Sequence, residues 1–190
     1  TVTQPTPSMR KAMYEAELGD DVFGEDPTVN RLQEMAAERL GKEAALLVVS
    51  GTMGNLVSCL THCQRGDEII LGDMAHIHLF EAGGVSSMGS IHTRTVPNLP
   101  DGSLDPDDVL AAIRKPWNVH YPVSRLLALE NTHNRCNGAA VPVEKMDALG
   151  RLAHENGLQV HLDGARVFNA QAALGVPAAR IARECDSVQF

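Results

Sequence analysis

Short, dense apolar runs alternate along this chain with longer stretches that have helical periodicity and turn signals at their ends. Short runs that are apolar at every position are typical of strands covered on both faces, as in a parallel sheet. The alternation therefore indicates an α/β fold, with a mostly parallel sheet and helices on both faces. We expect strands at Ala44–Val49, Ile69–Leu71, Leu126–Leu129 and Val160–Leu162.

Three helices have ends that the sequence marks clearly. The first has Asp26 as its N-cap, Pro27 in its first turn and a glycine at its end, which is the usual asymmetry of helix termini. The other two also begin at a proline. The expected limits are Asp26–Gly41, Asp105–Ile113 and Pro142–Gly157.

Composition and charge narrow the class of ligand. With 190 residues, of which 44% are hydrophobic, the chain can bury a substantial core and corresponds to one domain or a large part of one. The net charge is −8, and lysines and arginines do not cluster with aromatic residues. This argues against a nucleic-acid partner and an anionic membrane surface, and favours a small molecule.

Targeting signals are not visible in the sequence. No apolar run approaches the roughly 20 residues of a membrane-spanning helix, and no signal or transit peptide stands out. We expect a soluble intracellular protein, cytoplasmic in the first instance. The mitochondrial matrix stays open, because the chain begins at Thr1 without a methionine.

The cysteines are scattered rather than framed, which is typical of a reducing compartment. Cys59 and Cys63 lie four apart on one helical face with His62 beside them. This trio suggests either buried helix packing or the start of a metal site. Because no second cysteine or histidine pair completes a ligand set, packing is favoured and we predict no metal.

A carboxylate and a guanidinium lie close together where the last predicted strand ends. That strand continues directly into Asp163-Gly164-Ala165-Arg166, and the carboxyl ends of parallel strands are where α/β enzymes hold ligands. Asp163 can pair with a protonated ring nitrogen and Arg166 can hold an anionic oxygen, which together suit a pyridoxal phosphate site. The alternative is a helix N-cap with a surface ion pair.

The segment Ser50–Asn55 follows the first predicted strand and leads into a helix. Gly51 lets the backbone approach a ligand closely, Thr52 offers a hydroxyl, and the helix N-terminus supplies unpaired amides for a phosphate. The segment matches neither a Walker loop nor a dinucleotide fingerprint, so the phosphate would belong to something smaller than ATP or NAD. A strand-to-helix turn without a ligand is the alternative.

His76 follows the predicted strand Ile69–Leu71. An imidazole there can stack on a planar cofactor or exchange protons near neutral pH, and Glu81 is placed to orient it. One alternative is a histidine in a surface loop. The other is a metal site with His78, for which no third ligand is evident.

Two further polar features are open to more than one interpretation. The run Glu130–Asn134 ends a predicted buried strand, where polar side chains act either as loop caps or as site residues. His120 lies between Trp117 and Tyr121 and is interpreted by default as part of a partly exposed aromatic cluster.

Several segments together resemble the low-specificity L-threonine aldolases, which are fold-type I pyridoxal phosphate enzymes of the β-eliminating lyase group. The resemblance spans nearly the whole chain. The block Gly19–Thr28 is quite specific to that family, whereas Asp163–Arg166 is shared more widely among related lyases. The resembling segments are Thr1–Thr6, Gly19–Thr28, Phe80–Gly84, Leu129–Asn134 and Asp163–Arg166.

The resemblance implies pyridoxal 5'-phosphate as the cofactor and a role for each candidate residue. Gly51 and Thr52 would hold the phosphate, and His76 would stack on the pyridine ring. Asp163 would pair with the ring nitrogen, and Arg166 would contact the cofactor hydroxyl or the substrate carboxylate.

The resemblance also implies the reaction and the assembly. L-threonine or L-allo-threonine would be cleaved to glycine and acetaldehyde, with His76 or His120 as the base. His120 falls where the family has a second histidine near the substrate hydroxyl, and the segment Gly19–Thr28 would help to line a neighbouring subunit's site. A homo-oligomer, dimer or tetramer, follows from that sharing.

Such an enzyme needs a lysine to hold the resting cofactor, and no lysine here is convincingly placed. The resemblance puts the family's lysine just beyond Phe190. Residues 1–190 would then be an N-terminal segment plus most of the cofactor-binding large domain, lacking the small carboxyl-terminal domain and inactive alone. The alternatives are another fold-type I lyase or aminotransferase, or a non-catalytic fragment or pseudoenzyme. The lysines are Lys11, Lys42, Lys115 and Lys145.

Overall fold

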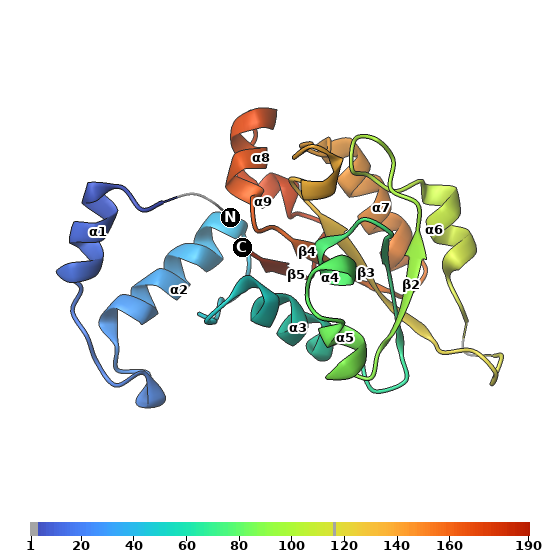
Figure 1. Ribbon diagram of the computed structural model, residues 1–190, viewed down its shortest axis with the longest axis horizontal. Helices are drawn as coiled ribbons and strands as arrows, with labels where there is room; N and C mark the ends of the chain where they lie inside the picture. The colour runs from blue at the N-terminus through green and yellow to red at the C-terminus, as the bar shows by residue number, and fades with distance from the viewer. Residues whose placement is uncertain (1–3, 116) are drawn as a thin grey trace. The chain divides into compact units, whose positions relative to one another are not determined.

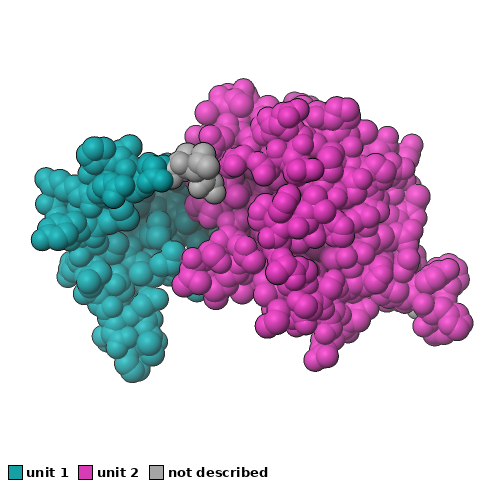
Figure 2. Space-filling view, in the orientation of Figure 1, with its two compact units in different colours: residues 1–47 teal, residues 48–190 magenta. Residues whose placement is uncertain are grey.

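The computed structural model (Figure 1) describes residues 4–115 and 117–190 of the chain. These residues form two compact units, residues 1–47 and residues 48–190 (Figure 2). The second unit contains the sheet and every candidate site residue named above. No helix in the described part of the chain is long and apolar enough to cross a membrane.

The first unit is helical. It contains α1 (Pro7–Tyr14), the short 3-10 helix η1 (Asp21–Phe23) and α2 (Pro27–Leu40). As predicted, the Asp26 carboxylate caps α2 by accepting N–H groups of its first turn, and Gly41 ends it in the left-handed conformation.

The second unit is built on a parallel sheet of five strands in the order β2-β1-β3-β4-β5. Three strands fall where apolar runs predicted them, which confirms the α/β fold. The strand β2 was missed because its sequence, His-Thr-Arg-Thr-Val, is mostly polar and its burial is partial. The strands are β1 (Glu68–Gly72), β2 (His92–Val96), β3 (Ser124–Glu130), β4 (Gln159–Asp163) and β5 (Ser187–Gln189).

Helices cover both faces of this sheet, as predicted (Figure 1). The helices α3 and α5 pack on one face, and α6 and α7 pack together on the other. The predicted helices at Asp105 and Pro142 are confirmed as α6 and α7. The helices are α3 (Gly51–His62), α4 (His76–Leu79), α5 (Gly84–Ser87), α6 (Pro106–Ala112), η2 (Asn134–Cys136), α7 (Val143–Glu155), α8 (Val167–Leu174) and α9 (Ala178–Ile181).

The predicted strand at Ala44–Val49 is wrong. This segment is irregular, and Leu46, Leu47 and Val49 are 71%, 50% and 93% exposed. An extended segment becomes a strand only when a neighbour supplies the hydrogen-bond ladder, and none of the described strands pairs with it. Apolar composition indicates which residues seek burial, but not whether a partner strand is present.

The core lies between the sheet and its helices, and it includes the two cysteines of α3. Cys59 and Cys63 are buried beside strand residues such as Ile69 and Leu126. Burial raises the pKa of both thiols to about 12. The burial of both side chains in the core fits the packing interpretation, and the absence of a metal there stays a prediction.

Candidate active site

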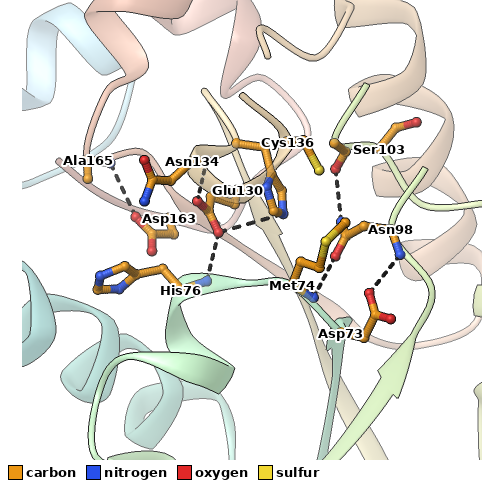
Figure 3. Close-up of polar contacts among 12 residues, drawn as sticks. Asp73, Met74, His76, Asn98, Ser103, Glu130, Asn134, Cys136, Asp163 and Ala165 are labelled. Carbon is orange, nitrogen blue, oxygen red and sulfur yellow. Dashed lines mark hydrogen bonds and ion pairs between the residues drawn. The ribbon is translucent and has the colours of Figure 1, made fainter. Parts of the chain in front are cut away.

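The carboxyl ends of the parallel strands bring the candidate residues together at one edge of the sheet. His76 follows β1, Glu130 ends β3, Asp163 ends β4 and Gln189 ends β5. Glu130 and Asp163 are direct partners in the register of β3 and β4. Figure 3 shows His76, Glu130 and Asp163 gathered at this edge.

Asp163 is neither a helix cap nor part of a surface ion pair. It is 4% exposed, and the N-cap of α8 is Arg166, which makes no capping bond with its side chain. Asp163 Oδ2 accepts from Asn55 Nδ2 at 3.0 Å, and Oδ1 accepts from Ala165 N at 3.2 Å. The Gln189 amide, with its nitrogen toward Asp163, donates to Oδ1 at 3.1 Å.

These contacts set the charge and the remaining capacity of Asp163. Burial raises the pKa of this carboxyl to about 6, and the nearby charge of Glu130 adds to the effect. The bonds from Ala165 and Asn55 oppose that rise. A carboxylate has about four acceptor positions, so the donors from Asn55, Ala165 and Gln189 leave room at Oδ2 for one more.

His76 is held at both its backbone and its ring. Its backbone N donates to Glu130 Oε2 at 2.8 Å, and its Nδ1 lies 2.9 Å from Glu81 Oε1. Glu81 is buried whereas the His76 side chain is 39% exposed. With Nδ1–H directed to Glu81, Nε2 is the nitrogen left to act as a base or ligand. The expected contact between Glu81 and His76 is present, and the orienting role stays a prediction.

Glu130 is both a loop-forming residue and part of the site. Its Oε1 accepts from Asn134 N at 2.9 Å, while its Oε2 accepts from His76 N. One carboxylate thus joins the loops that follow β1 and β3. Arg166 also reaches the second loop, where its Nη1 donates to Asn134 Oδ1 at 2.9 Å.

The loop that carries His76 has a second support, from Asn98. Asn98 Oδ1 accepts from Met74 N, Asn98 N donates to Asp73 Oδ1, and Asn98 Nδ2 donates to Gly102 O (Figure 3). A Cβ at Gly72 would collide with this amide. The glycine that ends β1 is therefore needed for the close approach of Asn98.

The first turn of α3 is formed as the sequence indicates. Ser50 is the N-cap, and its Oγ accepts from Met53 N at 3.1 Å. The N–H groups of Gly51 and Thr52 belong to the turn that has no acceptor within the helix. The side chain of Gln189 fills the space beside Gly51 at the sheet edge, where a Cβ would lie 3.0 Å from a terminal atom of its amide.

His120 is not brought to this edge within one chain. It is exposed and precedes Ser124, the first residue of β3, whereas the site lies at Glu130, the last residue of that strand. A role for His120 in the same chemistry therefore requires the site of another copy of the chain, and it stays a prediction.

Two lysines of the second unit make contacts away from the site. Lys145 Nζ donates to Asp101 and Ser103, and Lys115 Nζ donates to Asn156. Lys11 pairs with Glu15 in α1, and Lys42 follows α2 in the first unit. The lack of a lysine suited to hold the cofactor stays a prediction.

His76, Glu81 and Asp163 each offer a donor atom, and these atoms lie within 4.8 Å of one another. Such a set could hold a cation. Glu81 Oε1 and Asp163 Oδ2 already accept from Asn55, however, and Glu81 also binds the ring of His76. The absence of a metal stays a prediction.

Similarity to known proteins shows the family of this chain. A sequence profile of the beta-eliminating lyase family matches residues 1–190. The chain belongs to the beta-eliminating lyase family. It is 55% identical over 192 residues to a probable low-specificity L-threonine aldolase 2 of Arabidopsis thaliana, with all of this chain and 54% of that protein covered.

One further relative confirms the resemblance stated from the motifs, and one solved structure shows the same fold. The low specificity L-threonine aldolase of Escherichia coli K12 is 47% identical over 187 residues, covering 98% of this chain and 55% of that protein. A threonine aldolase structure from Leishmania major has a TM-score of 0.81 at 24% identity, covering 97% and 54% of the two chains. The chain thus spans about half the length of the relatives it matches.

Proposed function

We propose that the complete polypeptide containing this chain is a pyridoxal-phosphate-dependent aldolase. Its substrates would be L-threonine and L-allo-threonine, and its products glycine and acetaldehyde. The observation that carries the proposal is Asp163, a buried carboxylate at the end of β4 with room for one more donor. The similarity to low-specificity L-threonine aldolases supports the choice of substrate.

The residues at this edge fit pyridoxal phosphate in charge and position. Asp163 would take the protonated ring nitrogen at the free position of Oδ2, and that positive charge would keep the carboxylate ionised. His76 would cover the ring face. Gly51 and Thr52 at the N-terminus of α3 would hold the phosphate, and Arg166 would hold the cofactor hydroxyl or the substrate carboxylate.

When bound, the cofactor supplies an electron sink for the charge that develops at the substrate Cα. The protein's own contribution is to hold and move protons. Glu81 keeps the His76 proton on Nδ1, so that Nε2 can take the proton of the β-hydroxyl, directly or through water. His120 of a second copy is the other candidate base.

The assembly proposed with this function is a homo-oligomer, a dimer or a tetramer. In the first unit, Val22 and Phe23 are 86% and 76% exposed, as expected for a segment that lines another subunit's site. Light scattering on the complete polypeptide tests this directly, and a monomer at micromolar concentration would contradict it. The 190-residue chain alone should show no turnover, because Lys145 and Lys115, the lysines of the second unit, contact residues other than those around Asp163.

The function is tested with the complete polypeptide, loaded with pyridoxal phosphate and given each threonine diastereomer. Acetaldehyde is followed by its reduction with NADH and alcohol dehydrogenase, and glycine by amino-acid analysis. We expect the two products in equal amounts from both substrates. A loaded protein that forms neither product, or that forms an oxo acid by amino transfer, would contradict the proposal.

A further inference from the structure

A buried amide, that of Asn55, connects two carboxylates of the site. Asn55 is 1% exposed and lies in α3. Its Nδ2 donates to Glu81 Oε1 at 2.7 Å and to Asp163 Oδ2 at 3.0 Å. An amide nitrogen has two N–H bonds, so each carboxylate receives one. The reverse orientation would place the amide oxygen against both carboxylates, and it is therefore excluded.

The orientation of Asn55 decides the tautomer of His161. Asn55 Oδ1 lies 3.0 Å from His161 Nε2, and because an amide oxygen only accepts, Nε2 carries a proton. Full burial, with a smaller contribution from His62, lowers the pKa of His161 to about 3. The ring is therefore neutral near pH 7, and its Nδ1 is an acceptor.

The same reasoning extends to Ser187 and His62. Ser187 Oγ lies 2.8 Å from His161 Nδ1, so the hydroxyl donates its proton there. His62 Nε2 lies 2.8 Å from the same oxygen and so donates its N–H to it. The bonds run in one direction, from His62 at the end of α3 through Ser187 and His161 to Asn55.

We propose that Asn55, His161 and Ser187 are positioning residues that hold Glu81 and Asp163 in the orientation the reaction needs. Asn55 acts on both carboxylates directly, and His161 and Ser187 act by holding its amide in place. The catalytic consequence rests on the proposed function. The direction of the hydrogen bonds does not, since it depends on the protein alone.

The direction is tested by solid-state ¹⁵N NMR on the complete polypeptide without cofactor, labelled at histidine. A His161→Gln variant identifies the His161 signals. We expect a neutral ring with the proton on Nε2 from pH 5 to pH 8. Ser187→Ala should keep the proton on Nε2, because Asn55 Oδ1 still accepts there, but should shift the Nδ1 signal, which loses its hydrogen-bond donor, whereas Ser187→Thr should keep the wild-type signals. A charged ring at pH 6, or a proton on Nδ1 only, would overturn the proposal.

The catalytic consequence is tested by steady-state threonine cleavage. Asn55→Ala should lower kcat about 10- to 100-fold, as for loss of bonds to charged groups, with KM changed less than about threefold. The acidic limb of the pH profile should move upward, because Asp163 loses a donor to its ionised form. The other charges that face Asp163 are those of Glu130, Glu81 and His76.

Ser187→Ala and Ser187→Thr separate positioning from a merely structural role, and they remain informative if Asn55→Ala fails to fold. The alanine variant should lower kcat and shift the pH profile in the same direction as Asn55→Ala, and threonine should restore both. A matched control is His154→Gln, which removes a histidine bonded to Asp186 outside the network. Wild-type kcat and pH profile in Asn55→Ala, or in Ser187→Ala, would overturn the proposal. A wild-type protein that cleaves no threonine would overturn the proposed function instead, and the NMR result would still decide the direction.

Discussion

Glu130 accepts the backbone N–H of His76 at 2.8 Å, so the last side chain of β3 fixes the start of the helix that carries the candidate base. The same carboxylate accepts from Asn134 N. Each carboxylate oxygen therefore holds one loop of the site. Loss of either hydrogen bond should shift the backbone at His76 or at Asn134.

The isosteric variant Glu130→Gln keeps one of these acceptors and places an N–H₂ group against the other backbone N–H. We expect kcat for threonine cleavage to fall about 10- to 100-fold. Because the charge of Glu130 raises the pKa of Asp163, the acidic limb of the pH profile should move downward. Steady-state assays from pH 5 to pH 9 measure both effects, and an unshifted limb would contradict the electrostatic part.

The raised pKa of Asp163 makes the cofactor-free protein less stable as pH rises. The folded state holds this proton more tightly than the unfolded state, whose pKa is the ordinary 3.8. The contribution of Asp163 to the free energy of unfolding is therefore fully present below about pH 4. It declines as the pH rises through 6, by up to about 3 kcal/mol.

Thermal melting of the cofactor-free polypeptide, compared with Asp163→Asn, isolates this effect because the variant cannot ionise. The melting temperature of the variant relative to wild type should increase from pH 4 to pH 7. A difference that stays constant with pH would contradict the assignment.

The absence of a side chain at Gly54 makes room for the side chain of Gln189. A Cβ at Gly54 would lie 2.6 Å from Gln189 Cγ, which is closer than side chains tolerate. Gly54→Ala should destabilise the protein by about 1–3 kcal/mol, although alanine is the better helix former. The control Gly84→Ala meets no atom within 4 Å and should be neutral. Because Gln189→Ala also removes a donor to Asp163, the contact is measured as a difference: Gly54→Ala should cost much less in the Gln189→Ala background than in the wild type, and an equal cost in both would show that the contact is unimportant.

Asp147 anchors α7 to the arginines at α9 and beyond it. It accepts from Arg180 at 2.8 and 2.7 Å and from Arg183 at 2.7 Å. Burial alone would raise the pKa of Asp147, but these arginines and Arg151 outweigh it and hold the pKa below its usual value. Its stabilising effect is thus present above the ordinary pKa and is lost as pH falls.

Asp147→Ala should therefore destabilise the protein by about 1.5–3 kcal/mol at pH 7 and by less at pH 3. Its kcat at 25 °C should stay near wild type, because Asp147 lies outside the site. Melting curves at the two pH values measure the difference, and equal destabilisation at both would contradict the ion-pair assignment.

The sequence was sufficient for the parts of the site that depend on position along a strand. Asp163 and His76 were found because polar residues directly after buried strands meet at one sheet edge. The prediction of a strand at Ala44–Val49 failed because strand pairing depends on a partner, which a local sequence pattern does not reveal.

The sequence did not reveal the buried residues that support the site side chains, Asn55 and Gln189. Asn55 is a polar residue on the buried face of α3, and helical periodicity could have marked it as a buried polar side chain. Its partners could not be identified in that way, because Glu81 and Asp163 are distant in sequence. Gln189 lies on a short strand whose neighbours give little indication of contact with Gly54. Such contacts arise only when β4, β5 and α3 are packed together.

The proposed threonine cleavage depends on the buried carboxylate of Asp163 at this sheet edge. The most direct measurement is kcat of Asp163→Ala in the complete polypeptide saturated with pyridoxal phosphate, with Arg151→Gln as a surface control. We expect the alanine variant to release no acetaldehyde above background, because the ring-nitrogen partner is gone, while the control stays near wild type. Wild-type activity in Asp163→Ala would contradict the account.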